Sequence, residues 1–344
     1  MPMDASSVLA VGGIVLSLTF AFTNGYNDAG ADVATMVASG AASVKGALLT
    51  ASLANFIGAM VGGSAVVLTV QGILPADLAG SLGLGMFCAV LAAIAWNAIS
   101  WYYGIPSSST HALIGGLVGV GVALQGMAGV NWGTEELLAG QLVGVVKVIA
   151  FLLVSVLVGF GGSFLLMKLA RLALRRAKVG LNAHLRRLQW LTTGFQTLAH
   201  GANDAQKQMA LIALALMTFG NAPATVPLWA RVACATAIGL GSLGGGYRIM
   251  RTVGRRIFKL RPVHALVVQA NTSLTVALST AMGAPVSSTQ VVTAGVMGVG
   301  SAENRKLVHW QIGKDLIASW FLTIPATAGI AAVAVVALRA IMGG

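Results

Sequence analysis

Long runs of apolar residues with almost no charge recur along the whole chain of 344 residues. Several runs reach 20 residues or more, which is the length that a helix needs to cross a hydrocarbon core of roughly 30 Å. The candidate spans are residues 8–27, 47–75, 78–103, 137–167, 226–247, 263–283 and 316–338. The pattern predicts an all-α polytopic membrane protein with roughly 10–12 membrane segments.

Composition and charge narrow this prediction. The chain is 57% hydrophobic and 9% charged, against about 25% charged residues in a typical soluble domain, so it has too few charges to coat a water-soluble fold. Lys and Arg concentrate in residues 168–187 and 248–261, between apolar runs, which is typical of cytoplasmic loops rather than of a nucleic-acid-binding surface. We therefore expect a multi-pass protein of the cell (inner) membrane, in contact with the lipid bilayer and not with nucleic acid.

Two polar motifs each occur twice, in the same order. The pair Asn27-Asp28 of the first half recurs in the second half as Asn203-Asp204. A proline followed by hydroxyl residues, PSSST at 106–110, likewise recurs as PVSST at 285–289. Two different motifs repeated at nearly the same separation indicate an internal duplication.

The duplication divides the chain into a first membrane repeat, residues 1–167, and a second membrane repeat, residues 190–344, joined by a basic cytoplasmic linker, residues 168–189. Interrupted hydrophobic segments at corresponding positions of two halves are typical of transporters with inverted repeats, whose binding site lies at the repeat interface near mid-membrane. We expect inverted repeats with broken helices. A parallel duplication is the alternative that the sequence leaves open.

Three aspartates, Asp28, Asp32 and Asp204, lie within otherwise apolar stretches. A carboxylate at the middle of a membrane costs at least about 2.5–3.5 kcal/mol, so each one marks a candidate functional site. The alternative is structural, with the carboxylate closing a helix N-terminus or pairing with a nearby base such as Lys207. Duplication of the Asn-Asp pair favours the functional interpretation.

The hydroxyl motifs indicate anion binding. Proline suits the first turn of a helix and Ser or Thr its cap, so each motif predicts a helix start whose free N–H groups and hydroxyls can hold an anion. The alternative is that these hydroxyls only cap the start of their own helix and bind no anion. The candidate substrate-binding hydroxyls are Ser107, Ser108, Ser109 and Thr110 in the first copy, and Ser287, Ser288 and Thr289 in the second.

Carboxylates and a bound oxyanion repel each other strongly where the dielectric constant is low. The conflict is removed if a cation or a proton accompanies the anion, because Asn and Asp side chains can ligate Na+ and burial favours protonated Asp. Asp28 and Asp204 are the candidate Na+ sites. The residues therefore predict a symporter. A passive anion channel needs no buried acids, so the duplicated aspartates argue against a channel. We also expect no enzyme, because the HExxH and GxSxG motifs are absent from the sequence.

The stretches "TNGYNDA", "HGANDAQKQMALIALAL", "PSSSTHALIGGLVG" and "PVSSTQVVTAGVMGVG" resemble the PiT family of inorganic phosphate transporters, relatives of the animal sodium–phosphate cotransporters, over both halves of the chain. The resemblance implies movement of orthophosphate driven by an H+ or Na+ gradient, without another cofactor. It also implies inverted repeats with re-entrant helical hairpins, and a homodimer. By matching position, it implies substrate and cation ligands at Asn27, Asp28, Asn203 and Asp204.

One departure from the family pattern concerns the coupling ion. The family commonly continues its first motif Asp-x-Ala-Asn-Ala, whereas here Ala31 replaces the usual Asn and Asp32 is added. Asp32 is therefore a further candidate for cation coupling, as a proton site or as a partner for a base, or else it faces a polar vestibule. Sulfate or another oxyanion is the alternative substrate. A carboxylate acceptor favours phosphate, because phosphate keeps a proton near neutral pH and sulfate does not.

Three basic residues next to the motifs have open roles. Lys207 could neutralise Asp204, touch the anion, or extend to the membrane interface. For His111 and His200 we expect a structural hydrogen bond, with proton relay as the alternative.

Overall fold

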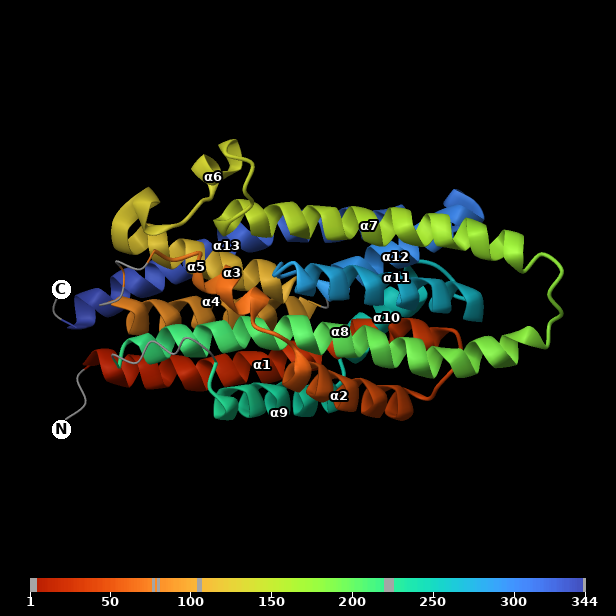
Figure 1. Cartoon of the computed structure of the whole chain (residues 1–344), viewed down its shortest axis with the longest axis horizontal. Coiled ribbons are helices and arrows are strands. Elements are labelled where there is room, and N and C mark those ends of the chain that lie inside the picture. Colours follow the sequence, from red (N-terminus) through yellow and green to blue (C-terminus); the bar gives the residue numbers. More distant parts are fainter. Residues whose placement is uncertain (1–4, 76–77, 79–80, 104–106, 220–225, 343–344) are drawn as a thin grey trace.

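The computed structural model describes residues 5–75, 78, 81–103, 107–219 and 226–342, and every regular element in these ranges is helical. The long helices lie along a common direction (Figure 1). The Asn-Asp motifs lie inside two long helices, α1 (Ala5–Ala38) and α8 (Leu181–Met217). These two helices run in opposite directions (Figure 1).

In the described ranges, six α-helices follow α1 in the first half and five follow α8 in the second. After α1 come α2 (Val44–Val61), α3 (Ala65–Gln71), α4 (Leu82–Tyr103), α5 (Ser109–Gln125), α6 (Thr134–Leu138) and α7 (Gly144–Ala173). After α8 come α9 (Leu228–Gly244), α10 (Tyr247–Arg251), α11 (Pro262–Ala281), α12 (Ser288–Asn304) and α13 (Trp310–Met342). Short turns of other helix types lie at Gly126–Gly129, Thr252–Arg256 and Arg305–Leu307.

Helices of the two halves are interleaved. Helix α1 packs on α4 and α9, and α8 packs correspondingly on α11 and α2. Helix α5 packs on α13, and α12 packs on α7. Each half therefore completes its packing with helices of the other half, and the two Asn-Asp motifs come together at the centre.

Matched glycines permit the closest of these helix contacts. A Cβ at Gly25 of α1 would collide with the backbone of Ile238 in α9, and a Cβ at Gly201 of α8 would collide with the backbone of Asn55 in α2. Gly25 and Gly201 occupy the same position relative to the Asn-Asp pair that follows each of them. Small residues at such positions let helix backbones approach closely in a membrane protein.

Two clusters of buried apolar side chains lie on either side of the motifs. Along α1, Phe20 and Ala21 belong to one cluster, whereas Ala29 and Val33 belong to the other. Asp28 lies at the change from one to the other. The polar site is thus enclosed between two apolar layers.

The predicted helical character is confirmed, whereas several predicted boundaries are wrong. The apolar run 47–75 is two helices, because α2 ends at Val61 and Gly62 caps it before α3 begins. The run 137–167 likewise contains the end of α6 and, from Gly144, α7. In the described ranges, six helices are long and apolar enough to cross a membrane by length and composition: α1, α2, α4, α5, α7 and α13.

The basic linker expected at 168–189 is largely helical. Helix α7 continues to Ala173 and α8 begins at Leu181, so only residues 174–180 connect them. Charged residues and helix are compatible here, because both helix ends extend beyond their apolar segments. Pro106 of the first hydroxyl motif lies outside the described residues.

Candidate functional site

The Asp28 carboxylate accepts hydrogen bonds from hydroxyl groups of both halves of the chain. Its carboxylate is buried, with the residue 6% exposed. The Ser109 hydroxyl at the start of α5 donates to its Oδ2 at 3.2 Å, and the Thr289 hydroxyl at the start of α12 donates to its Oδ1 at 2.7 Å. One hydroxyl from each of the two candidate anion-binding motifs therefore contacts the same candidate aspartate, Asp28.

Asp204 is also buried, and its partners are nitrogen donors. The Lys207 ammonium donates to its Oδ1 at 2.6 Å. Its Oδ2 lies 2.8 Å from His200 Nε2 and accepts a hydrogen bond from the Asn24 side-chain amide. Each Asp204 oxygen is therefore satisfied within the protein.

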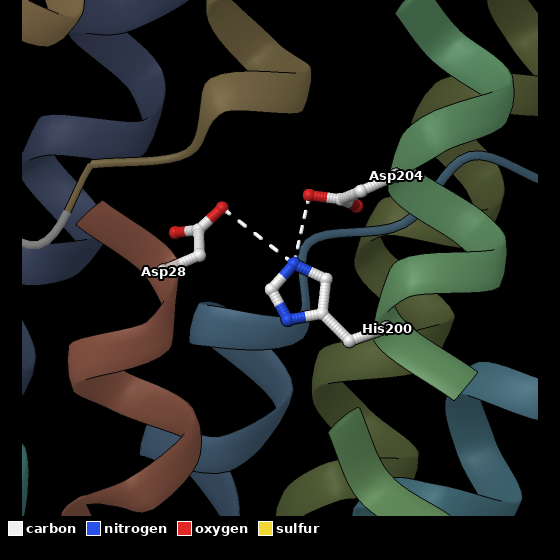
Figure 2. Close-up of side chains that lie close together, drawn as sticks. All are labelled: Asp28, His200 and Asp204. Carbon is white, nitrogen blue, oxygen red and sulfur yellow. Dashed lines mark hydrogen bonds and ion pairs between the residues drawn. The ribbon is translucent and has the colours of Figure 1, made fainter. Parts of the chain in front are cut away.

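The His200 imidazole connects the two Asn-Asp motifs. Figure 2 shows its ring between Asp28 and Asp204. The Nε2 atom lies 3.9 Å from Asp28 Oδ2 and 2.8 Å from Asp204 Oδ2. The other ring nitrogen, Nδ1, contacts the Asp32 carboxylate, and the Ser288 hydroxyl lies 3.3 Å from the same nitrogen. One side chain thereby joins three carboxylates from α1 and α8.

A cation could be held between Asp28, His200 and Asp204. One ligand atom from each of these residues lies within 4.8 Å of the others. The carboxylate oxygens suit Na+, which takes oxygen ligands in transporters, and a proton could be shared on the same groups. The arrangement can therefore take up positive charge beside the hydroxyls that could receive an anion.

Lys207 points into the protein and not toward an interface. The residue is 2% exposed. Its ammonium donates to the Thr110 hydroxyl at 2.6 Å and to the Val286 carbonyl at 2.9 Å, in addition to Asp204. Of the roles left open by the sequence, extension to an interface is therefore wrong.

The two motif asparagines have different surroundings. Asn203 Nδ2 donates to the Thr280 hydroxyl at 2.8 Å and to the Ala284 carbonyl at 3.0 Å, and its Oδ1 accepts from the Val286 N–H at 3.2 Å. Asn203 therefore positions the non-helical segment before α12. Asn27 instead lines, with Asp28, Ser107 and Ser109, a cavity of about 10 Å³.

The other motif hydroxyls have mixed roles. Ser108 caps α5, because its hydroxyl accepts a hydrogen bond from the His111 N–H at 3.1 Å. Ser287 begins α12 without a side-chain capping bond. The self-capping alternative therefore holds for Ser108, whereas Ser109 and Thr289 face Asp28.

His200 makes more contacts in the site than the single structural hydrogen bond expected of it, and Asn24 is a site residue that was not among the candidates. These residues occupy matched positions of the duplication, and each is a polar residue in an apolar stretch. Their pairing in the duplication was the signal that could have identified them. His111 is also buried and its ring nitrogen Nδ1 lies 3.3 Å from Gln290, so it is a hydrogen-bonded side chain next to the site.

A larger cavity opens next to the C-terminal end of α1. Its volume is about 670 Å³, and Ala34 and Ala38 of α1 form part of its wall. Its basic lining consists of Arg248, Arg251, Arg255 and Arg256. A concave basic surface of this kind raises the local concentration of anions.

A helical fold with apolar spans, duplicated polar motifs and a buried cluster of carboxylates between the two halves is typical of a membrane transporter. A sequence model of the phosphate transporter family matches residues 24–331. The chain belongs to this family. The predicted family resemblance and the absence of an enzymatic role are thereby confirmed, since the family and its relatives are transporters.

Two relatives and one solved structure show the extent of the similarity. The chain is 35% identical to a "probable low-affinity inorganic phosphate transporter" of Bacillus subtilis (strain 168), over 96% of this chain and 98% of the relative. It is 35% identical to a protein of the same name from Rhizobium meliloti (strain 1021), over 96% and 97%. It is also similar to the solved structure of "the sodium-dependent phosphate transporter", at 26% identity with a TM-score of 0.86, over 97% of this chain and 100% of the other.

Proposed function

We propose that this protein carries inorganic phosphate across the cell (inner) membrane by symport with H+ or Na+. The observation that carries the proposal is the meeting of both hydroxyl motifs at Asp28, next to His200 and Asp204. Hydroxyl donors and helix N-termini suit a phosphate, and the carboxylates suit the accompanying cation or a proton of the phosphate itself.

The charges of the site support coupling. Three carboxyl groups, those of Asp28, Asp32 and Asp204, lie near one ammonium and one imidazole. Even with a protonated imidazole, fully ionised acids outnumber the bases by one. An added anion is therefore repelled unless positive charge enters with it.

The arrangement of the helices supports a proposal of inverted repeats and alternating access. Helices α1 and α8 run in opposite directions, and the hairpins α4–α5 and α11–α12 extend from opposite ends toward the centre (Figure 1). We propose that these hairpins are re-entrant. The cavity beside Asp28 is about 10 Å³, no larger than one water needs, so the site must widen before phosphate can bind.

Residues 168–187 and 248–261 would face the cytoplasm under the positive-inside rule. The arginine-lined cavity would then be the cytoplasmic entrance for phosphate. A homodimer is part of the proposal, on the family resemblance alone. Blue-native electrophoresis of the purified protein with covalent cross-linking tests it.

Uptake into proteoliposomes tests the proposed symport. Radiolabelled phosphate should accumulate when an inward H+ or Na+ gradient is imposed, and the effective gradient identifies the ion. Uptake that is indifferent to both gradients would rule out symport. Competition by excess sulfate equal to that by unlabelled phosphate would assign the chain to general oxyanion transport instead.

A further inference from the structure

The Lys207 ammonium is enclosed by three oxygen atoms. They are Asp204 Oδ1 at 2.6 Å, Thr110 Oγ1 at 2.6 Å and the Val286 carbonyl oxygen at 2.9 Å. A lysine ammonium has three N–H donors and no acceptor. All three donors are therefore engaged, and none remains for a bound anion.

The chemistry of these ligands is that of a sodium site. They are a carboxylate, a hydroxyl and a carbonyl of the non-helical segment before α12, which is the donor set that transporters offer to Na+. They come from α8, α5 and the start of α12, so they join elements of both halves. The Thr110 hydroxyl also donates to the Val286 carbonyl at 2.9 Å, which holds two of the oxygens together.

The matched position in the first half lacks such a cation. When Asp28 is aligned with Asp204, the residue that matches Lys207 is Ala31. Asp28 bonds directly to Thr289, whereas Asp204 is joined to Thr110 through the Lys207 ammonium. In the part of the chain that the structure describes, no Lys or Arg forms an ion pair with Asp28. The two carboxylates of the duplicated motif are therefore unequal.

We propose that the Lys207 ammonium is a resident cation, which permanently fills the cation site at Asp204 and leaves Asp28 as the motif carboxylate available to a transported ion. This inference rests on the proposed symport for its meaning. The occupancy of the site by the ammonium is a property of the folded chain and can be tested without phosphate or transport.

The variant Lys207→Ala removes the ammonium and keeps the three oxygens. Purified variant and wild type are unfolded by heat in phosphate-free buffer with choline, Na+ or methylammonium chloride at equal ionic strength. The small cations should raise the Tm of the variant by about 5 °C more than that of the wild type, because a free cation now stabilises only the folded site. The control Lys147→Ala removes a lysine whose ammonium donates to the Thr69 hydroxyl and leaves Lys207 in place, so it should shift like the wild type.

A second variant keeps the test decisive. Lys207→Ala combined with Asp204→Asn removes the carboxylate as well, and it should lose the added response to Na+. The inference is overturned if Na+ and methylammonium shift Lys207→Ala no more than the wild type, or if the double variant responds as strongly as the single one. It is also overturned if Lys207→Ala folds in none of the salts while the double variant folds, because a free cation then fails to replace the ammonium.

This outcome is separable from that of the uptake experiment. Wild-type uptake indifferent to ion gradients would end the proposed symport and leave the Tm result intact. A missing Tm response would end the resident-cation inference and leave gradient-driven uptake intact.

Discussion

The hydroxyl of Thr289 provides the sharpest test of the site, through the substitution Thr289→Val. Valine has nearly the shape of threonine, so the change removes a hydrogen bond and leaves the packing of α12 in place. Thr289 is 2% exposed and its hydroxyl donates to Asp28 Oδ1 at 2.7 Å. The lost bond is short, buried and made to a carboxylate.

The expected magnitude follows from these properties. A hydrogen bond to a charged group contributes about 1.5–3 kcal/mol, and burial prevents water from replacing it. If the same hydroxyl turns to the phosphate during transport, the loss appears in phosphate affinity as a factor of roughly 10 to 150. We expect a Tm lowered by about 3–6 °C together with a KM for phosphate uptake raised by that factor.

The assay compares Thr289→Val with Thr293→Val in the same proteoliposomes. Thr293 lies one turn further along α12, is 1% exposed, and its hydroxyl has no hydrogen-bond partner among the described residues. Its replacement should therefore leave KM and Tm close to the wild type. Equal KM values for Thr289→Val and wild type would refute a phosphate contact at this hydroxyl, as would an equal loss in both variants.

Three further changes test other parts of the site. Asp204→Asn should abolish gradient-driven uptake, because His200 and Lys207 lose the carboxylate that they share, while the protein still inserts into the membrane fraction. Uptake at the wild-type rate would remove Asp204 from the mechanism. Asn203→Ala should destabilise the protein by about 2–4 kcal/mol in a denaturant titration, because three hydrogen bonds to residues 280–286 are lost, and an unchanged midpoint would contradict this role. Gly201→Ala should broaden or abolish the size-exclusion peak, because the added Cβ collides with the Asn55 backbone. The control Gly194→Ala lies on the same helix and its added Cβ meets no atom within 4 Å, so its peak should stay like that of the wild type. Similar behaviour of the two variants would argue against the close α8–α2 contact.

Much of the fold class could be predicted from the sequence, because the relevant signals are local. Apolar runs longer than a membrane core indicate membrane helices wherever they occur. The duplication is also visible in one dimension, since Asn27-Asp28 and Asn203-Asp204 need only be compared by eye. The boundaries were less predictable, because a run such as 47–75 is apolar throughout and only its glycines mark the break after Val61.

The partners of each polar side chain could not be read in the same way. Asp28 bonds to Ser109 and Thr289, which lie in two different halves of the chain and are both distant from it in sequence. Nothing along the chain selects Ser109 rather than Ser108 as the partner, because that choice depends on which side of the α5 start faces α1. The inward direction of Lys207 has the same origin, since its acceptors Thr110 and Val286 come from two other elements.

The sequence by itself determined that this protein is a duplicated membrane transporter with acids and hydroxyls placed in its apolar core, because span length and repeated motifs are properties of neighbouring residues. Only the tertiary structure decided that both hydroxyl motifs converge on Asp28, that His200 joins the two halves, and that Lys207 is locked onto Asp204. The physical reason is that a buried polar group must find its partner in three dimensions. The packing of α1 on α8, with the starts of α5 and α12 directed at them, sets which groups come within hydrogen-bonding distance.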